Sequence, residues 1–193
     1  MENSEAVGTD GLPAELLNVG LNKDRSILRD LHRLITTTWR EGKVPQRWKE
    51  AIIMAIQKKD KPECGNYRGI SLVFHAGKVL LKVITKRLSK YCGRKGPLPE
   101  EQSEFRPSRS TIDMMFMVCR LQELGRKARV QLLLCFIDIQ KPYDSVDRNL
   151  LWQVLSSLGV PPEMITVIRE FHDGMKACVR SSDGTCLKPF EVN

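Results

Sequence analysis

An apolar run that ends in an acidic residue is the strongest constraint on the fold of this chain. Residues 130–137 are apolar except for one Gln, and Asp138 follows them directly. We predict a buried strand over residues 131–138. A carboxylate at the end of a buried strand is costly unless a cation meets it, and a divalent metal ion is one such cation. The alternative is that Asp138 simply ends the strand and caps a turn.

Helical and strand patterns alternate along the rest of the chain. Apolar residues at helical spacing predict helices over residues 12–20, 23–41, 75–91, from Ser110 or Thr111 onward, over 150–158 and from Pro161 onward. Short apolar runs predict a hairpin of strands over 51–56 and 70–73, and Asp183-Gly184 predicts a second hairpin near the C-terminus. The pattern therefore indicates a compact, mixed α/β protein.

The charge of the chain favours a polyanionic partner. Thirty-one Lys and Arg residues outnumber 23 Asp and Glu residues, which gives a net charge of +8. Nucleic acid is one such partner, although a protein that is basic for no functional reason would look the same. The basic, turn-rich stretch over residues 57–69 either leans on phosphates or is a solvated loop.

Cysteine and histidine usage points to an intracellular protein. None of the six cysteines forms a C-x-x-C pair, so we expect reduced thiols rather than a disulfide framework. The three histidines are far apart, which gives no zinc spacing. The polar, acidic start is unlike a secretory signal, and no apolar run approaches the roughly 20 residues of a membrane span. We therefore expect a nuclear or cytoplasmic protein that is not secreted and has no membrane partner.

Several segments, taken together and in order, resemble the reverse transcriptase of a non-LTR (LINE-type) retrotransposon. The most specific strings are NYRGISL from Asn66, FRPSRSTID from Phe105 and FIDIQKPYDSVDR from Phe136. The resemblance runs over nearly the whole chain and implies an α/β (α+β) fold of the right-hand polymerase type, with helices packed on short, mostly antiparallel sheets. Residues 1 to about 115 would be fingers, residues from about 116 to 193 would be the first part of the palm, and the thumb would be absent.

The resemblance also implies roles for particular residues. Asp138 matches the first metal-binding aspartate of the palm, which would hold two Mg²⁺ ions together with carboxylates elsewhere. Tyr143 matches the aromatic residue beneath the incoming sugar, although by itself it would read as a core aromatic. Arg68 matches a fingers residue that grips the incoming triphosphate, and Lys58 and Lys59 match a basic pair near the same phosphates.

Two further arginines and the partners follow from the same resemblance. Arg106 and Arg109 lie in a segment that would face the template or the nucleotide. Backbone capping and surface charge are the alternative, for Arg109 in particular. The implied partners are an RNA template, a DNA primer and deoxynucleoside triphosphates, and the implied reaction is RNA-directed DNA synthesis.

Some positions depart from the family pattern. Pro142 stands where the family usually has alanine, which removes a backbone amide from a turn near the triphosphate, and Glu104 stands where it usually has glycine. The later block with two aspartates does not follow, and Asp144 and Asp147 read more simply as helix caps. We therefore expect a reverse transcriptase domain that does not polymerise as this chain. The alternative is a relic that binds nucleic acid through a basic fingers surface, or that has no selected function.

Overall fold

The structure of the chain is a computed structural model that describes residues 7–11, 15, 25–57, 63–96, 98–181 and 183–192. Its helices are α2 (Arg25–Glu41), α3 (His75–Lys95), α4 (Thr111–Ala128), α5 (Arg148–Ser157) and α6 (Pro162–His172), and its strands are β1 (Glu50–Gln57), β2 (Tyr67–Val73), β3 (Lys176–Arg180) and β4 (Phe190–Glu191), with single 3-10 turns η1 (Gln46–Lys49) and η2 (Cys64–Asn66). The mixed α/β fold is confirmed. All but one residue of the helix predicted over 12–20 lie outside the described residues.

The chain divides into two compact units. The first comprises residues 1–84 and 161–193, and the second comprises residues 85–160. The division of the chain into fingers up to about residue 115 and palm beyond it stays a prediction. No helix in the described part of the chain is long and apolar enough to cross a membrane.

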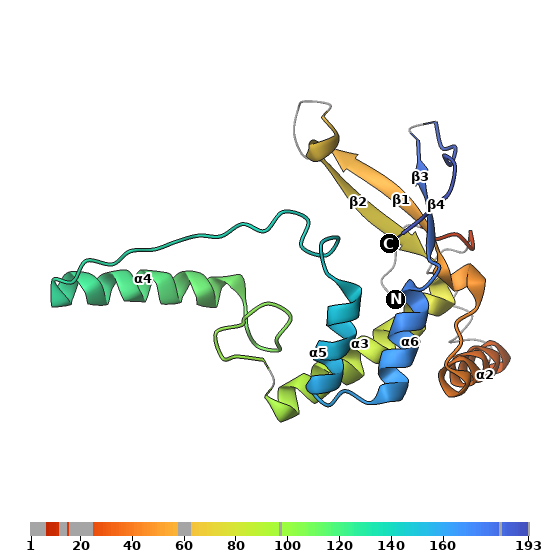
Figure 1. The fold of residues 1–193 in the computed structure, drawn as a ribbon, viewed down its shortest axis with the longest axis horizontal. Coiled ribbons are helices and arrows are strands. Elements are labelled where there is room, and N and C mark those ends of the chain that lie inside the picture. Colours follow the sequence, from red (N-terminus) through yellow and green to blue (C-terminus); the bar gives the residue numbers. More distant parts are fainter. Residues whose placement is uncertain are drawn as a thin grey trace. The chain divides into compact units, whose positions relative to one another are not determined.

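The first unit is built on a four-stranded sheet in the order β2-β1-β3-β4 (Figure 1). β1 pairs antiparallel with β2, so that Ile52 faces Leu72, and this confirms the predicted hairpin. On its other side β1 pairs parallel with β3, and β3 pairs antiparallel with β4. The sheet is therefore mixed but mostly antiparallel, as expected. Local sequence patterns gave no sign of the parallel pairing, because its two strands are far apart in the chain.

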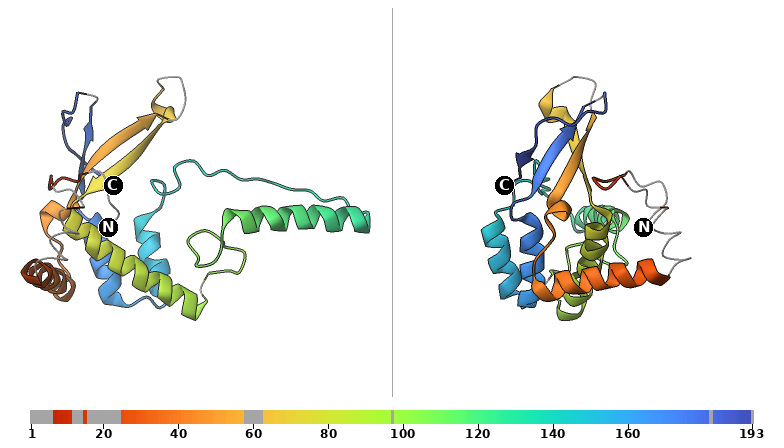
Figure 2. Two further views of the ribbon diagram at one scale, coloured as in Figure 1. Left: turned by 180° about the vertical axis from the view of Figure 1, so that it is seen from behind. Right: turned by 90° about the vertical axis from the view of Figure 1, so that its right-hand side faces the viewer.

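An aromatic stack beside the sheet forms part of the core of the first unit. The rings of Trp48, in η1, and Phe171, in α6, lie with their centroids 6.4 Å apart and an interplanar angle of 16°. In Figure 2 the C-terminal end of α6 lies at the same end of the sheet as η1. Gly77 of α3 comes close to both rings: a Cβ atom there would lie 3.2 Å from Cβ of Trp48. The glycine therefore allows α3 to approach the stack.

The N-terminal segment is attached to this unit by a buried polar contact. Asp10 accepts a hydrogen bond from the backbone N–H of His75 at 2.9 Å, and its carboxylate oxygens lie 3.0 Å from Nδ1 of the same residue. The two side chains are 3% and 2% exposed. Gly8 lies against the backbone carbonyl of Val73 so closely that a Cβ atom would not fit. Asp10 thus satisfies an orphan N–H at the start of α3.

The predicted C-terminal hairpin is present. Gly184 adopts φ 87°, which favours glycine, and Thr185 donates to Asp183 through its backbone N–H at 3.0 Å and its hydroxyl at 2.7 Å. These two hydrogen bonds stabilise the carboxylate and lower the pKa of Asp183 below its ordinary value. A hydrogen bond with Cys186 that stabilises the protonated thiol, and to a smaller extent burial, raise the pKa of Cys178.

The helices predicted in the second unit are also present, but α3 continues past the predicted end at Tyr91, through Gly93, to Lys95. Asp147 caps α5 by accepting a hydrogen bond from the N–H of Leu150 at 3.0 Å. This is the capping role that the sequence favoured for Asp147 over metal binding. The hydroxyl of Tyr91 donates to the carbonyl oxygens of Leu158 at 2.7 Å and Gly159 at 2.9 Å. These contacts hold the C-terminal end of α5 against α3 within this unit.

The strand predicted over residues 131–138 is wrong. Residues 130–139 have no regular secondary structure and are all exposed. Even Phe136 and Ile137 are 81% and 83% exposed. Figure 1 shows this stretch as a long irregular trace between α4 and α5. Among the described residues no strand pairs with it. An apolar run becomes a strand only where a neighbour satisfies its N–H and C=O groups, so composition alone misled the prediction.

A buried ammonium group provides a test of how the first unit is held together. Lys49 is 7% exposed and donates to Glu170 at 2.5 Å and to the carbonyl oxygen of Asp173 at 3.2 Å. We expect Glu170→Ala to lower the free energy of unfolding by about 3 kcal/mol, because it leaves a cation buried without its anion. Lys49→Met removes the cation itself and fills the same space, so it should cost less.

Urea unfolding of both variants, followed by circular dichroism, checks this expectation. A Glu170→Ala variant that is as stable as the unaltered chain, or more stable than Lys49→Met, would contradict a stabilising role for the pair.

Candidate nucleic-acid interface

Arg68 lies on the exposed hairpin of the first unit. It belongs to β2 and sits opposite Ile56 of β1, near the end of the hairpin that leads into the basic loop. Its side chain is exposed. Lys58 and Lys59 lie outside the described residues. The hairpin therefore presents a guanidinium to solvent, which is the arrangement that phosphate contact requires.

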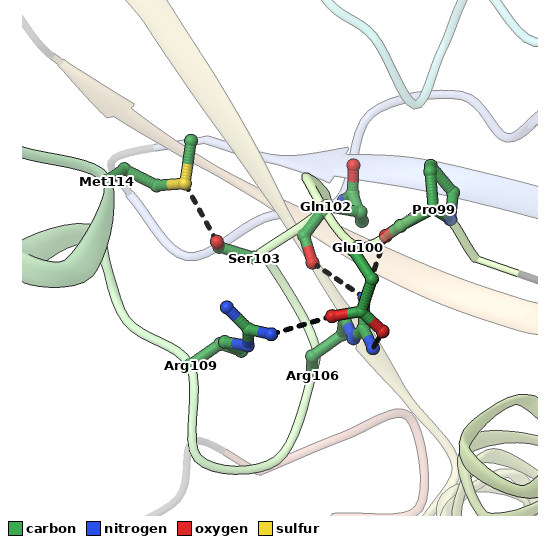
Figure 3. Close-up of polar contacts among 7 residues, drawn as sticks. All are labelled: Pro99, Glu100, Gln102, Ser103, Arg106, Arg109 and Met114. Atoms are coloured by element: carbon green, nitrogen blue, oxygen red, sulfur yellow. Dashed lines mark hydrogen bonds and ion pairs between the residues drawn. The ribbon is translucent and has the colours of Figure 1, made fainter. Parts of the chain in front are cut away.

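Arg106 and Arg109 are brought together by an acidic residue that sequence reasoning missed. The carboxylate of Glu100 accepts from Nη2 of Arg106 at 3.2 Å and from Nη2 of Arg109 at 2.8 Å (Figure 3). Figure 3 shows the two guanidinium groups on either side of this carboxylate. Three glutamates at positions 100, 101 and 104, before the FRPSR string, were the available signal. They were hard to read because spacing in a loop does not say which side chains meet.

The two arginines differ in what else they contact. Nη1 of Arg106 donates to the backbone carbonyl oxygens of Pro99 at 2.7 Å and Gln102 at 3.4 Å, and its side chain is 22% exposed. The side chain of Arg109 is 38% exposed and, among the described residues, its recorded side-chain contact is Glu100 alone. Backbone capping, which the sequence suggested for Arg109, is instead what Arg106 does. Arg109 is the more available of the two cations.

Helix α4 begins directly after Arg109 and has a closed N-terminus. Ser110 is its N-cap: Oγ accepts from the N–H of Asp113 at 3.4 Å, and the Asp113 carboxylate accepts from the N–H of Ser110 at 2.7 Å. Ser110 was one of the two residues at which the sequence predicted this helix to begin, and Asp113 completes its capping box. The capping box fixes the end of the loop that carries Arg109, and so fixes the position from which the Arg109 side chain extends.

Two loop residues before α4 adopt left-handed backbone conformations. Phe105 has φ 58° and Ser108 has φ 59°. A glycine, which the family usually has at the position of Glu104, could adopt a positive φ that a glutamate would resist. Glu104 does not adopt one, and the positive φ falls on the next residue instead. An L-residue in this region costs on the order of 1 kcal/mol, so the loop is held by other contacts, among them those of Arg106.

Asp138 and Tyr143 lie in the exposed stretch of the second unit. Asp138 is exposed, and Tyr143 is 71% exposed, so it is not the core aromatic that local reading suggested. Between them Lys141 has φ 46°, and its carbonyl oxygen accepts from the N–H groups of Asp144 at 3.0 Å and Ser145 at 3.2 Å. The turn over residues 141–145 thus forms with Pro142 in place, although Pro142 offers no N–H.

The described carboxylates do not assemble a metal site around Asp138. Within the part of the chain that the structure describes, no group of three or more His, Cys, Asp or Glu residues lies close enough to share an ion. One exposed carboxylate does not satisfy the coordination of two Mg²⁺ ions, which take six oxygen ligands each. The described residues therefore do not fit the two-metal arrangement.

The comparison with known protein families decides the identity of the fold. The family described as reverse transcriptase (RNA-dependent DNA polymerase) matches residues 56–188, a span that contains every residue singled out above as a candidate. The chain belongs to the reverse transcriptase family. Enzymes of this family generally use divalent metal ions, together with a nucleic-acid template and nucleotide substrates.

The relatives narrow the family to LINE-type retrotransposons. The chain is 24% identical over 181 residues to an uncharacterized 149 kDa protein of transposon TX1 from Xenopus laevis, which covers 93% of this chain and 14% of that protein. It is 30% identical over 171 residues to a 115 kDa protein in the type-1 retrotransposable element R1DM of Drosophila melanogaster, covering 86% of this chain and 16% of that protein.

A third relative is the RNA-directed DNA polymerase from the mobile element jockey of Drosophila melanogaster. It is 27% identical over 151 residues, which is 72% of this chain and 16% of that polymerase. These relatives make the chain a LINE-type reverse transcriptase domain, as its motifs indicated. The chain spans about a seventh of the length of the curated relatives it matches.

The unequal contacts of the two arginines generate a testable difference. Arg106→Gln should destabilise the loop before α4 by about 1 kcal/mol, because two backbone carbonyls lose a charged donor. Arg109→Gln removes a contact between two exposed side chains and should change the stability by less than about 0.5 kcal/mol. The two variants carry the same change of charge, so each is the control for the other.

Limited proteolysis of the loop over residues 99–110, together with thermal unfolding, measures the effect. Equal protease sensitivity of the two variants would show that Arg106 does not hold the loop.

Proposed function

We propose that this chain supplies the fingers and the first part of the palm of an RNA-directed DNA polymerase. The observation that carries the proposal is the match to the reverse transcriptase family over residues 56–188, which includes the motif residues Arg68, Arg106, Arg109, Asp138 and Tyr143. The reaction would be transfer of a nucleotide onto a primer 3′-hydroxyl, directed by an RNA template. The whole enzyme's template, primer and deoxynucleoside triphosphate partners are part of the same proposal.

The roles proposed for individual residues follow from their chemistry. Arg68, Lys58 and Lys59 would bind the triphosphate, because a guanidinium offers two parallel donors to phosphate oxygens and an ammonium group adds a point charge. Asp138 would be one carboxylate ligand of the divalent ions. Tyr143 would lie beneath the incoming sugar, where a ring excludes a 2′-hydroxyl. The exposure of Arg68, Asp138 and Tyr143 supports these roles, because each side chain is free of a structural role in the core.

Nucleic-acid binding without polymerisation is a second candidate function. It is favoured by the net charge of +8. It is also favoured by the surroundings of Asp138, because no metal-binding group of three or more His, Cys, Asp or Glu side chains is found among the described residues. In this case the basic hairpin with Arg68 would hold RNA or DNA through phosphate contacts. The two candidates differ in whether the chain is part of an enzyme that extends a primer, and both require that the chain binds nucleic acid.

Primer extension tests whether the chain polymerises by itself. We expect no extension of an annealed DNA primer on an RNA template by the 193-residue chain, with either Mg²⁺ or Mn²⁺. The physical reason is that a single carboxylate cannot hold two divalent ions productively. The variant Asp138→Ala is the matched control. Extension by the chain that Asp138→Ala abolishes would show that the chain is catalytically complete and would refute this expectation.

Salt dependence tests the shared requirement for nucleic-acid binding. The affinity for a fluorescein-labelled single-stranded RNA, measured by fluorescence anisotropy, should fall linearly on a plot of log affinity against log salt. Arg68→Ala should weaken binding and reduce the magnitude of that slope by about one.

The control for this measurement is Arg29→Ala on α2, an exposed arginine whose side chain contacts the backbone of its own helix. Both variants lose one positive charge. Binding that does not vary with salt, or equal effects of the two substitutions, would count against a phosphate-binding hairpin.

A further inference from the structure

Glu100 makes contacts that a phosphate group would also make. Its side chain is 76% exposed, yet each of its two oxygens accepts from a different arginine: Oε1 from Arg106 at 3.2 Å and Oε2 from Arg109 at 2.8 Å. Carboxylate and phosphate oxygens both suit the planar fork of a guanidinium. An exposed carboxylate that binds two guanidinium groups therefore occupies the position of an anionic ligand (Figure 3).

The two arginines are not equally able to leave Glu100. Arg106 is retained by the carbonyl oxygens of Pro99 and Gln102, so it keeps its position whether or not the carboxylate is present. Among the described residues, the guanidinium of Arg109 donates to Glu100 and has no comparable hydrogen bond to a backbone carbonyl. It also departs from the loop next to the N-terminus of α4, where the helix dipole favours negative charge. An incoming anion could thus replace the carboxylate of Glu100 as the partner of Arg109.

The surroundings of Arg109 leave room for such a ligand. Arg109 and Ser110 line a cavity of about 530 Å³ together with Ser103 and Met114, and the carboxylate residues Glu101 and Glu104 line it as well. All of these residues belong to the second unit. An ion pair between exposed side chains is a weak contact, so a phosphate group, with more charge and more acceptor oxygens than a carboxylate, can displace it.

We infer that Glu100 is an internal competitor for a phosphate-binding site on Arg109, which it occupies until a phosphate group displaces it. This inference rests on the proposed function, since it assigns a regulator to the segment proposed to face the template or the nucleotide. The ligand chemistry is a phosphate group, supplied either by the backbone of a nucleic-acid strand or by a nucleoside triphosphate. Arg109 binds the phosphate, and Arg106 positions Glu100.

The test compares two charge-matched substitutions in the full chain. Glu100→Gln and Glu101→Gln remove neighbouring negative charges from exposed residues, so both change the net charge equally. We expect Glu100→Gln to bind a fluorescein-labelled single-stranded oligouridylate about two- to fivefold more tightly than the unaltered chain at low salt. Glu101→Gln should give a smaller gain, and Glu100→Ala should repeat the effect of Glu100→Gln if the amide disturbs the loop.

The double variant decides whether the gain passes through Arg109. In an Arg109→Gln background, Glu100→Gln should no longer tighten binding beyond the gain of Glu101→Gln. A second arm measures binding of deoxythymidine triphosphate by calorimetry. A gain for the oligouridylate identifies strand phosphates as the source, and a gain for the nucleotide identifies the triphosphate; either supports the site.

Three results overturn the inference. The first is an equal gain in Glu100→Gln and Glu101→Gln, and the second is a gain that persists in the Arg109→Gln background. In both cases the unaltered chain still binds RNA, so the proposed function survives while the role of Glu100 fails. The third is that no variant binds either probe, in which case the proposed function fails together with the inference.

Discussion

The two-sided pairing of β1 is the constraint on which the rest of the structure depends. Its antiparallel partner β2 follows it after a short loop, but its parallel partner β3 comes only after residues 58–175. Closing so long a loop costs conformational entropy, and burial of Ala51, Ile52 and Ala177 at this pairing offsets part of that cost. The intervening chain must leave the sheet and return to it. The second unit, residues 85–160, lies within that excursion.

Charged groups reinforce the same region. Lys49 precedes β1 directly and reaches across to α6, while Asp10 holds the N-terminal segment at the start of α3. Neither pair would be read from the sequence, because the partners lie far apart in the chain. Their burial makes them specific: each group is satisfied in this arrangement and would be unsatisfied in most others. The aromatic stack of Trp48 on Phe171 likewise packs η1 against α6.

The second unit carries four of the motif residues, Arg106, Arg109, Asp138 and Tyr143, and buries none of them. Asp138 and Tyr143 lie in an exposed stretch, and no residue of α4 is buried. What order this unit has near its motifs comes from local polar contacts, namely the capping box of Ser110 and Asp113 and the bridge of Glu100 between two arginines. Local contacts of this kind orient side chains without a large core, and they are also readily exchanged for a ligand. This combination suits a binding surface better than a finished catalytic centre.

The sequence by itself determined the helices, both hairpins and the family. Helical spacing and caps located α2 to α6 because the signals are local: Ser110 before an apolar stripe, Asp147 before Leu150, and Gly159 at positive φ after α5. The motif strings around Arg68, Arg106 and Asp138 identified a LINE-type reverse transcriptase domain, and the family match agrees. Only the tertiary structure decided the parallel pairing of β1 with β3, the bridging role of Glu100 and the exposure of residues 130–139. The physical reason is that hydrophobicity and spacing describe what a segment prefers, whereas strand pairing and ion pairing depend on which distant groups arrive beside it.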